Sequence, residues 1–210
     1  MRHLITIIAL AGAVGSASAT GLYANIGSDG IGVGAGRAVS ESVGLRGELN
    51  YGRLDYSFKS ADIDYDATIK LKSAGVYGDW FPTPSAFRLT AGLNFNGSRI
   101  DATGTSDRTL IINGRPYSAA GEKVYATIEW PSVMPYLGIG FGHGPAAKGW
   151  GMFADLGVLI GSPKTTLSTT PGLAAQVSSA DLEAERRKLQ EKADDYRIYP
   201  VLKIGVSYTF

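Results

Sequence analysis

The side chains that could carry acid–base or nucleophilic chemistry are few in this chain. It has no cysteine and two histidines, of which His3 lies near the start and His143 lies between two glycines. A serine-type hydrolase needs a histidine base and a carboxylate near its nucleophile. Neither a Gly-x-Ser-x-Gly nor a His-Glu-x-x-His motif occurs. We therefore interpret His143 as a turn or interfacial residue and predict no catalytic site.

Two further patterns could hold a ligand. The carboxylates of Asp62, Asp64 and Asp66 alternate along a strand end and could bind Ca²⁺ weakly, although a solvated loop face is the favoured interpretation. Alternating glycines occur at 30–36 and 138–142, but neither run has the Gly-x-Gly-x-x-Gly spacing of a nucleotide-binding turn. We interpret them as close-packing tracks that make room for large side chains from other strands. No metal and no cofactor is predicted.

Six charged residues interrupt segments in which apolar residues alternate with others. They are Arg46, Glu48, Asp79, Arg88, Asp155 and Lys203. If these segments cross a membrane as strands, a charge on the lipid face costs about 2–4 kcal/mol near the midplane, so all six are expected to face inward. Three are basic and three are acidic, which predicts a neutral ionic network with every charge paired. The alternative is that some of them lie at the rim, in water.

Turn signals divide the rest of the chain into strand-like segments. These lie at about 21–27, 31–39, 43–58, 64–81, 87–99, 136–141, 150–168 and 196–210, and residues 124–130 could lead into the segment 136–141 across the break at Pro131 and Pro135. The pattern predicts an all-β fold, an eight-stranded antiparallel up-and-down β-barrel in one domain of residues 20–210. Across the intervening turns, Asp79 should lie nearly opposite Arg88, and Asp155 near Lys203. A soluble β-sandwich or a lipocalin-like barrel is the alternative.

The two ends of the chain indicate export to a membrane. Residues 1–19 have a basic start, an apolar stretch and a small-residue site ending at Ala19, the pattern of a secretory signal peptide that is cleaved there. At the other end, apolar and polar residues alternate strictly from 202 to 210, so this segment is predicted to be the last barrel strand. The residues that characterise it are Lys203, Gly205, Tyr208 and Phe210.

This C-terminal pattern resembles the assembly signal of bacterial outer-membrane β-barrels, and the layout is similar to small barrels of the OmpA, OmpX and OmpW type. Residues 130–143 and 199–202 also resemble a family of uncharacterised proteobacterial outer-membrane proteins. The resemblance implies a cell outer membrane location, contact with outer-membrane lipid and lipopolysaccharide, and recognition of the last strand by the barrel-assembly machinery. Both termini and the short turns would be periplasmic, and the long stretches 101–121 and 169–195 extracellular.

The two long stretches contain local structure of their own. Asn113-Gly114 between apolar residues predicts a hairpin at 109–117. Ser178 followed by Asp181 predicts the start of a short extracellular helix between the last two strands, at 178–193. Its basic residues could meet lipopolysaccharide phosphates, although an ordinary solvated face is favoured. They are Arg186, Arg187 and Lys188.

Composition narrows the function classes. A net charge of +1 gives no reason to expect nucleic acid, and eight strands enclose an interior just wide enough for side chains. We therefore predict a monomeric, non-enzymatic barrel with a filled lumen and a structural or surface-interaction role. The alternatives are OmpW-like passage of small hydrophobic molecules and, less favoured, a lipid A-modifying enzyme.

Overall fold

The structure is a computed structural model that describes residues 20–60, 63–83, 85–106, 108–142 and 148–210. The segment interpreted as a signal peptide, residues 1–19, lies outside the described residues. So do Asp62 and His143, for which the interpretations above remain predictions.

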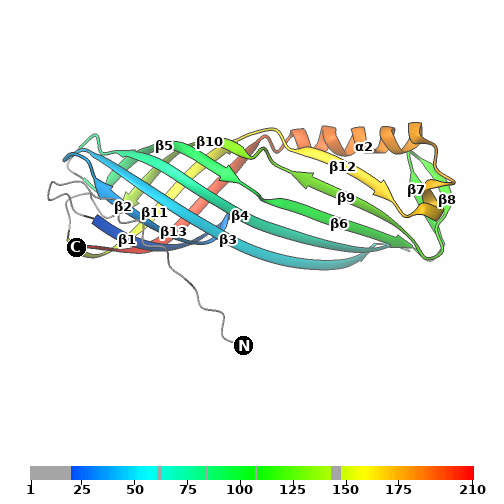
Figure 1. Ribbon diagram of the computed structural model, residues 1–210, viewed down its shortest axis with the longest axis horizontal. Helices are drawn as coiled ribbons and strands as arrows, with labels where there is room; N and C mark the ends of the chain where they lie inside the picture. Colours follow the sequence, from blue (N-terminus) through cyan, green and yellow to red (C-terminus); the bar gives the residue numbers. More distant parts are fainter. Residues whose placement is uncertain (1–19, 61–62, 84, 107, 143–147) are drawn as a thin grey trace, which may run out of the picture.

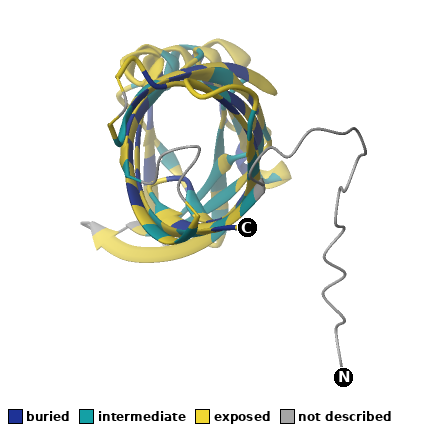
Figure 2. Cartoon of the chain, turned by 90° about the vertical axis from the view of Figure 1, so that its left-hand side faces the viewer, coloured by how far each residue is buried: buried dark blue, intermediate teal, exposed yellow. Residues whose placement is uncertain are grey.

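Eight antiparallel strands close into a ring. They are β1 (Thr20–Gly27), β2 (Gly30–Ala38), β3 (Val43–Ser60), β4 (Ile63–Trp80), β5 (Phe87–Asn96), β10 (Val133–Gly142), β11 (Gly149–Ile160) and β13 (Ile198–Thr209). Each pairs with the next around the ring, and the pairing of β4 with β5 completes the closure. Figure 2 looks along the axis of this ring. The predicted eight-stranded antiparallel barrel is confirmed.

The same sheet continues outward from one side of the barrel (Figure 1). Strands β3 and β4 are each 18 residues long, and their outer halves project beyond the ring. Along the free edge of β4 lie β6 (Arg99–Ser106), β9 (Glu122–Glu129) and β12 (Lys164–Thr169), in that order. We call the outer halves of β3 and β4 with these three strands the extension.

The extension corrects part of the loop prediction. Residues 101–106 were expected in a loop but belong to β6, which pairs with residues 63–70 of β4. The backbone N–H and C=O groups of the projecting β4 need partners, and β6 supplies them. Strand pairing therefore overrides the weak strand character of a segment made mainly of small and polar residues.

The outer end of the extension carries a small apolar cap. Strands β7 (Thr109–Ile112) and β8 (Arg115–Ser118) form the predicted hairpin, with positive φ at Asn113 (52°) and Gly114 (76°), as a type I′ turn requires. Two helices follow, α1 (Pro171–Ala174) and α2 (Ser179–Asp194), and Ser178 caps α2 as predicted. The buried residues of the cap are Leu110, Ile112, Ala119, Leu173 and Val177.

Helix α2 runs along the free edge of β12 (Figure 1). The side-chain amide of Gln190 takes the place of a neighbouring strand: its Nε2 donates to the Pro163 carbonyl at 2.8 Å, and its Oε1 accepts from the Thr165 N–H at 2.9 Å. Arg186 Nη1 donates to the Thr165 carbonyl at 3.4 Å. An open strand edge is a template for pairing with another chain, so α2 protects this one.

Replacing Gln190 with alanine should expose that edge. Loss of one hydrogen bond of about 0.5–1.5 kcal/mol corresponds to faster exchange of the Thr165 amide hydrogen by up to about tenfold. Hydrogen exchange followed by mass spectrometry measures this. Gln176→Ala is the matched control, since Gln176 bonds only within its own turn, to Gly172. Equal exchange rates for Thr165 in both variants would show that the Gln190 contact does not protect the edge.

The polarity of the two sheet faces inverts where the barrel becomes the extension. On β3 the barrel's outer face carries exposed Leu49 and Tyr51, whereas Glu48 and Asn50 are buried inside. Because alternate residues share a face, the outward positions of the extension are polar. They are Arg53, Asp55 and Ser57. The inward positions of the extension are apolar, namely Leu54, Tyr56 and Phe58.

Strand β4 repeats the inversion. Val76 faces outward and Tyr77 inward in the barrel, whereas Lys70 faces outward and Leu71 and Ile69 inward in the extension. The barrel therefore offers an apolar surface to lipid, and the extension offers a polar surface to water. The change between Tyr51 and Arg53 marks the boundary between the two environments.

Candidate functional site

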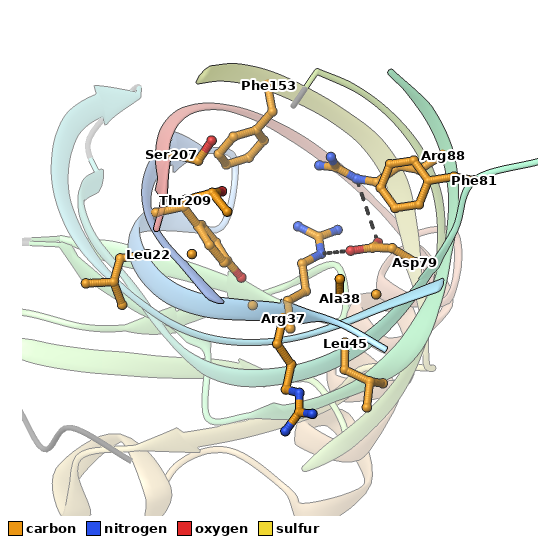
Figure 3. Close-up of a pocket in the computed structure, with 15 residues that line it drawn as sticks. Leu22, Arg37, Ala38, Leu45, Asp79, Phe81, Arg88, Phe153, Ser207 and Thr209 are labelled. Carbon is orange, nitrogen blue, oxygen red and sulfur yellow. Dashed lines mark ion pairs between the residues drawn. The ribbon is translucent and has the colours of Figure 1, made fainter. Parts of the chain in front are cut away.

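Four of the six predicted lumen charges form one buried cluster near the chain termini. We call Arg46, Asp79, Arg88 and Asp155 the inner cluster. Arg46 contacts Asp79 through Nε and Asp155 through Nη1, both at 2.9 Å, and Arg88 Nη2 lies 2.5 Å from Asp155. The Arg88 Nε is 3.7 Å from Asp79. Figure 3 shows Asp79 and Arg88 of this cluster, with a dashed line marking their ion pair.

The remaining two predicted charges lie further toward the extension, in what we call the outer cluster of Asp29, Glu48 and Lys203. Lys203 Nζ contacts the Glu48 carboxylate and lies 2.8 Å from Asp29 Oδ2. Two amides complete the group, because Asn25 and Asn50 donate to Glu48 at 3.0 and 2.7 Å. All three charged residues are buried.

The pairing of these charges differs from the simple cross-strand expectation. Asp155 does lie opposite Lys203 in register, but Lys203 pairs with Glu48 and Asp29, and Asp155 pairs with the two arginines. Asp79 lies opposite Thr90 and reaches Arg88 diagonally. Asp29 was not among the predicted lumen charges, because it lies between the strand-like segments 21–27 and 31–39. In the structure it lies in the turn between β1 and β2, where its buried carboxylate contacts Lys203.

The glycine tracks give the large lumen side chains their space. An ideal Cβ at Gly138 would lie 2.6 Å from the Tyr136 hydroxyl, and one at Gly157 would clash with the same ring. A Cβ at Gly140 would clash with Asp155 and Arg88. These close approaches explain the alternating glycines without any ligand.

The inner end of the lumen opens into a cavity of about 110 Å³. Phe81, Phe153 and Tyr23 are among its lining residues, and Figure 3 shows Phe81 beside Arg88 of the inner cluster. Phe81, the last residue of the predicted segment 64–81, is buried in this mouth. Its strand has ended at Trp80, so alternation no longer fixes which way its ring points.

Tyr208 and Phe210 of the proposed assembly signal lie at this end of the barrel, whereas Lys203 lies in the outer cluster. Strand β13 pairs with both β1 and β11 and so joins the first strand to the rest of the ring. Tyr208 packs edge-on against Phe210 and Trp150, with ring centroids 5.1 and 5.3 Å apart. Gly205 has no room for a side chain, since a Cβ would lie 2.5 Å from both the Ala24 carbonyl and the Phe153 ring.

At the far end of the extension, Asp181 joins α2 to the β7–β8 hairpin. Its carboxylate accepts hydrogen bonds from Asn113 Nδ2 (2.9 Å), the Tyr117 hydroxyl (2.7 Å) and Ser178 Oγ (2.9 Å), and it pairs with Arg115 at 3.1 Å. Hydrogen bonds from Asn113, Tyr117 and Ser178 lower the pKa of Asp181 to about 2.

The attachment of the hairpin should therefore depend on pH only in acid. A carboxylate whose pKa is lowered on folding stabilises the fold above its unfolded pKa of about 3.9, and the contribution is lost as the pH falls toward 2. We expect the Tyr117 amide to stay protected from exchange between pH 7 and 5, and to lose protection below about pH 4. In Asp181→Asn this acid transition should be absent. An identical transition in the variant would assign it to another group.

The basic residues of α2 are largely engaged within the protein. Arg186 pairs with Glu183 at 2.8 Å and Lys188 with Glu185 at 3.4 Å. Such exposed pairs along a helix are weak, so they leave the surface solvated. Among the described residues, no helix is long and apolar enough to cross a membrane, and no cluster of three metal-ligating side chains occurs.

A closed antiparallel ring with an apolar exterior and an ion-paired lumen gives this chain the fold of bacterial outer-membrane β-barrels. The crystal structure of Acinetobacter baumannii CarO is 24% identical, with a TM-score of 0.62 over 90% of this chain and 97% of that chain. That of Acinetobacter baumannii CarO2 is 23% identical, with a TM-score of 0.64 over 91% and 98%. Similarity at this level shows a shared fold. No family model and no curated protein matches the chain.

Proposed function

We propose that this chain is an integral barrel of the outer membrane with a closed lumen, and that it acts through its extension in a structural or surface-interaction role. The observation that carries the proposal is the stacking of the inner and outer clusters across the lumen. Their charged side chains converge from β3, β4, β5, β11, β13 and the β1–β2 turn. A lumen crossed twice by paired charges leaves no continuous aqueous path.

The orientation that fits this role places the chain termini in the periplasm and the extension outside the cell. The short turns near 39–42 and 81–86 lie at the same end as the C-terminus (Figure 1), and outer-membrane barrels have their short turns on the periplasmic side. The polar outward face of the extension suits water or lipopolysaccharide head groups. Recognition of β13 by the barrel-assembly machinery, and a monomeric state, belong to the same proposal.

Planar-bilayer recording of the refolded protein tests the closed lumen. We expect no single-channel steps, while a shift in gel mobility on heating shows that the barrel has folded. A porin reconstituted in the same way is the positive control for insertion. Steady, reproducible single-channel steps from the folded protein would overturn the proposal.

A second candidate is the passage of small hydrophobic molecules, supported by an apolar cavity of about 200 Å³ at the outer mouth. The outer cluster lies below this cavity, so passage would require a lateral exit through the barrel wall. Uptake of a hydrophobic dye by cells with and without the barrel distinguishes the two functions, since a closed barrel should give equal rates. The comparisons indicate no enzyme family, and a lipid A-modifying activity finds no support among the described side chains.

A further inference from the structure

The cavity at the outer mouth has walls suited to an apolar molecule. Its volume is about 200 Å³, and an apolar cavity of about 150 Å³ can hold benzene. The space is therefore large enough for a substituted ring. The apolar side chains that line it are Leu54, Ile69, Leu71, Ile100, Trp130, Met134, Leu159 and Tyr199.

Two polar atoms in the lining have no hydrogen-bond partner among the described residues. Asn94 is fully buried, and its Nδ2 donates to the Tyr77 hydroxyl at 3.3 Å, whereas its Oδ1 is unpaired. The indole Nε1–H of Trp130 is also buried and unpaired. Buried polar atoms nearly always find partners, so an acceptor and a donor are available within an otherwise apolar space.

The charged groups near the cavity are already paired. Lys70 and Arg99 both pair with Asp101, at 2.8 and 3.1 Å, on the outward face of the sheet. Asp29, which lies on the inner side of the cavity, contacts Lys203 at 2.8 Å. A charged ligand would have to displace the pair of Asp29 and Lys203 to gain a counter-charge, so the cavity favours a neutral molecule.

Access to the cavity is from the concave side of the extension. Leu54 lines the cavity and is 60% exposed, and the apolar inward face of the extension continues from it through Tyr56 and Phe58. A molecule can therefore reach the cavity along an apolar surface without entering the lumen below.

We propose that this mouth cavity binds a small, neutral, mainly apolar molecule with one hydroxyl group, of the phenol class. A hydroxyl both donates and accepts, so it can satisfy the Asn94 oxygen or the Trp130 indole N–H. The ring packs against the aromatic and aliphatic walls. This inference goes beyond the closed-barrel role, because the ligand is held above the outer cluster and need not pass it.

Three probes of similar size test the proposal on the full mature chain in lipid nanodiscs, with empty nanodiscs as the reference. They are p-cresol, toluene and p-toluate, and their binding is followed by saturation-transfer nuclear magnetic resonance and by calorimetry. We expect p-cresol to bind about tenfold more tightly than toluene, since one hydroxyl hydrogen bond separates them, and p-toluate to bind more weakly than p-cresol.

Two variants locate the binding. Asn94→Leu removes the unpaired oxygen at similar volume and should reduce the preference for p-cresol to what the Trp130 N–H supplies, while leaving toluene binding intact. Ile69→Trp fills the cavity and should abolish binding of both. Heat-modifiable gel mobility verifies that each variant is folded, and Leu93→Ala, on the lipid face of β5 next to Asn94, is the folded control. Equal binding of the probes to the wild type, or unchanged binding to Ile69→Trp, would overturn the proposal, whatever the bilayer recordings show about the lumen.

Discussion

Replacing Arg46 with alanine is expected to lower the free energy of unfolding of the barrel by about 3–5 kcal/mol. Its guanidinium bridges Asp79 and Asp155, at 2.9 Å each, in a site where its side chain is 8% exposed. Without it, two buried carboxylates share Arg88 alone. Breaking a buried pair costs more than the pair contributes, because a charge is left without a partner.

Urea titration of the refolded barrel in lipid vesicles, followed by tryptophan fluorescence, measures this loss. Arg53→Ala is the matched control, because Arg53 pairs with Asp55 at the same distance of 2.9 Å but in the solvent-exposed extension. It should leave the unfolding midpoint unchanged. A loss of less than about 1 kcal/mol in Arg46→Ala would show that the inner cluster behaves like a surface pair, and the lumen would then be hydrated.

Replacing Lys203 with methionine should have an effect of similar size, about 3–5 kcal/mol, because Glu48 and Asp29 would be left buried without a cation. The loss should appear when the purified chain refolds into vesicles, where no assembly machinery is present. Unfolding in urea measures it, and Lys203→Arg should restore part of the stability.

The same experiment separates the two roles proposed for Lys203. Phe210 is 62% exposed and packs only against Tyr208 among the aromatic residues described, so Phe210→Ala should change the stability of the refolded barrel little and reduce assembly in cells. If Lys203→Met were as stable as the wild type in vesicles yet failed to assemble in cells, the residue would belong to the assembly signal alone.

The barrel could be predicted from the sequence because its strands obey one simple rule. Lipid outside and a packed lumen inside impose alternation on every strand, and residues such as Leu202 and Lys203 fall on opposite faces by parity alone. The extension could not be delimited in this way. It keeps the alternation while reversing its sense, and its β6 strand consists largely of small and polar residues with little intrinsic strand preference.

The alternation of side chains along each strand predicted which residues face the lumen, but it did not predict which charged residues form ion pairs. Strands in a barrel are tilted and staggered, so a long side chain reaches diagonal neighbours as readily as the one directly opposite. Arg88 therefore contacts Asp155, two strands away, through the space left by Gly140. Lys203 likewise crosses the lumen to Glu48. The mouth cavity is likewise lined by residues that lie far apart in the sequence, and no local sequence pattern marks them.

The reversal of polarity along β3 and β4 also fixes how deep the protein sits in its bilayer. A displacement that moved the extension into the bilayer would carry Arg53 and Lys70 into hydrocarbon, at about 2–4 kcal/mol for each cation near the midplane. The opposite displacement would move Leu49 and Tyr51 into water. Many membrane proteins answer a change in bilayer thickness by tilting or shifting. Here the change from apolar to polar outward residues on β3 and β4 fixes the position of the membrane surface on one side of the barrel. The surrounding lipid therefore has to thin or thicken to match it.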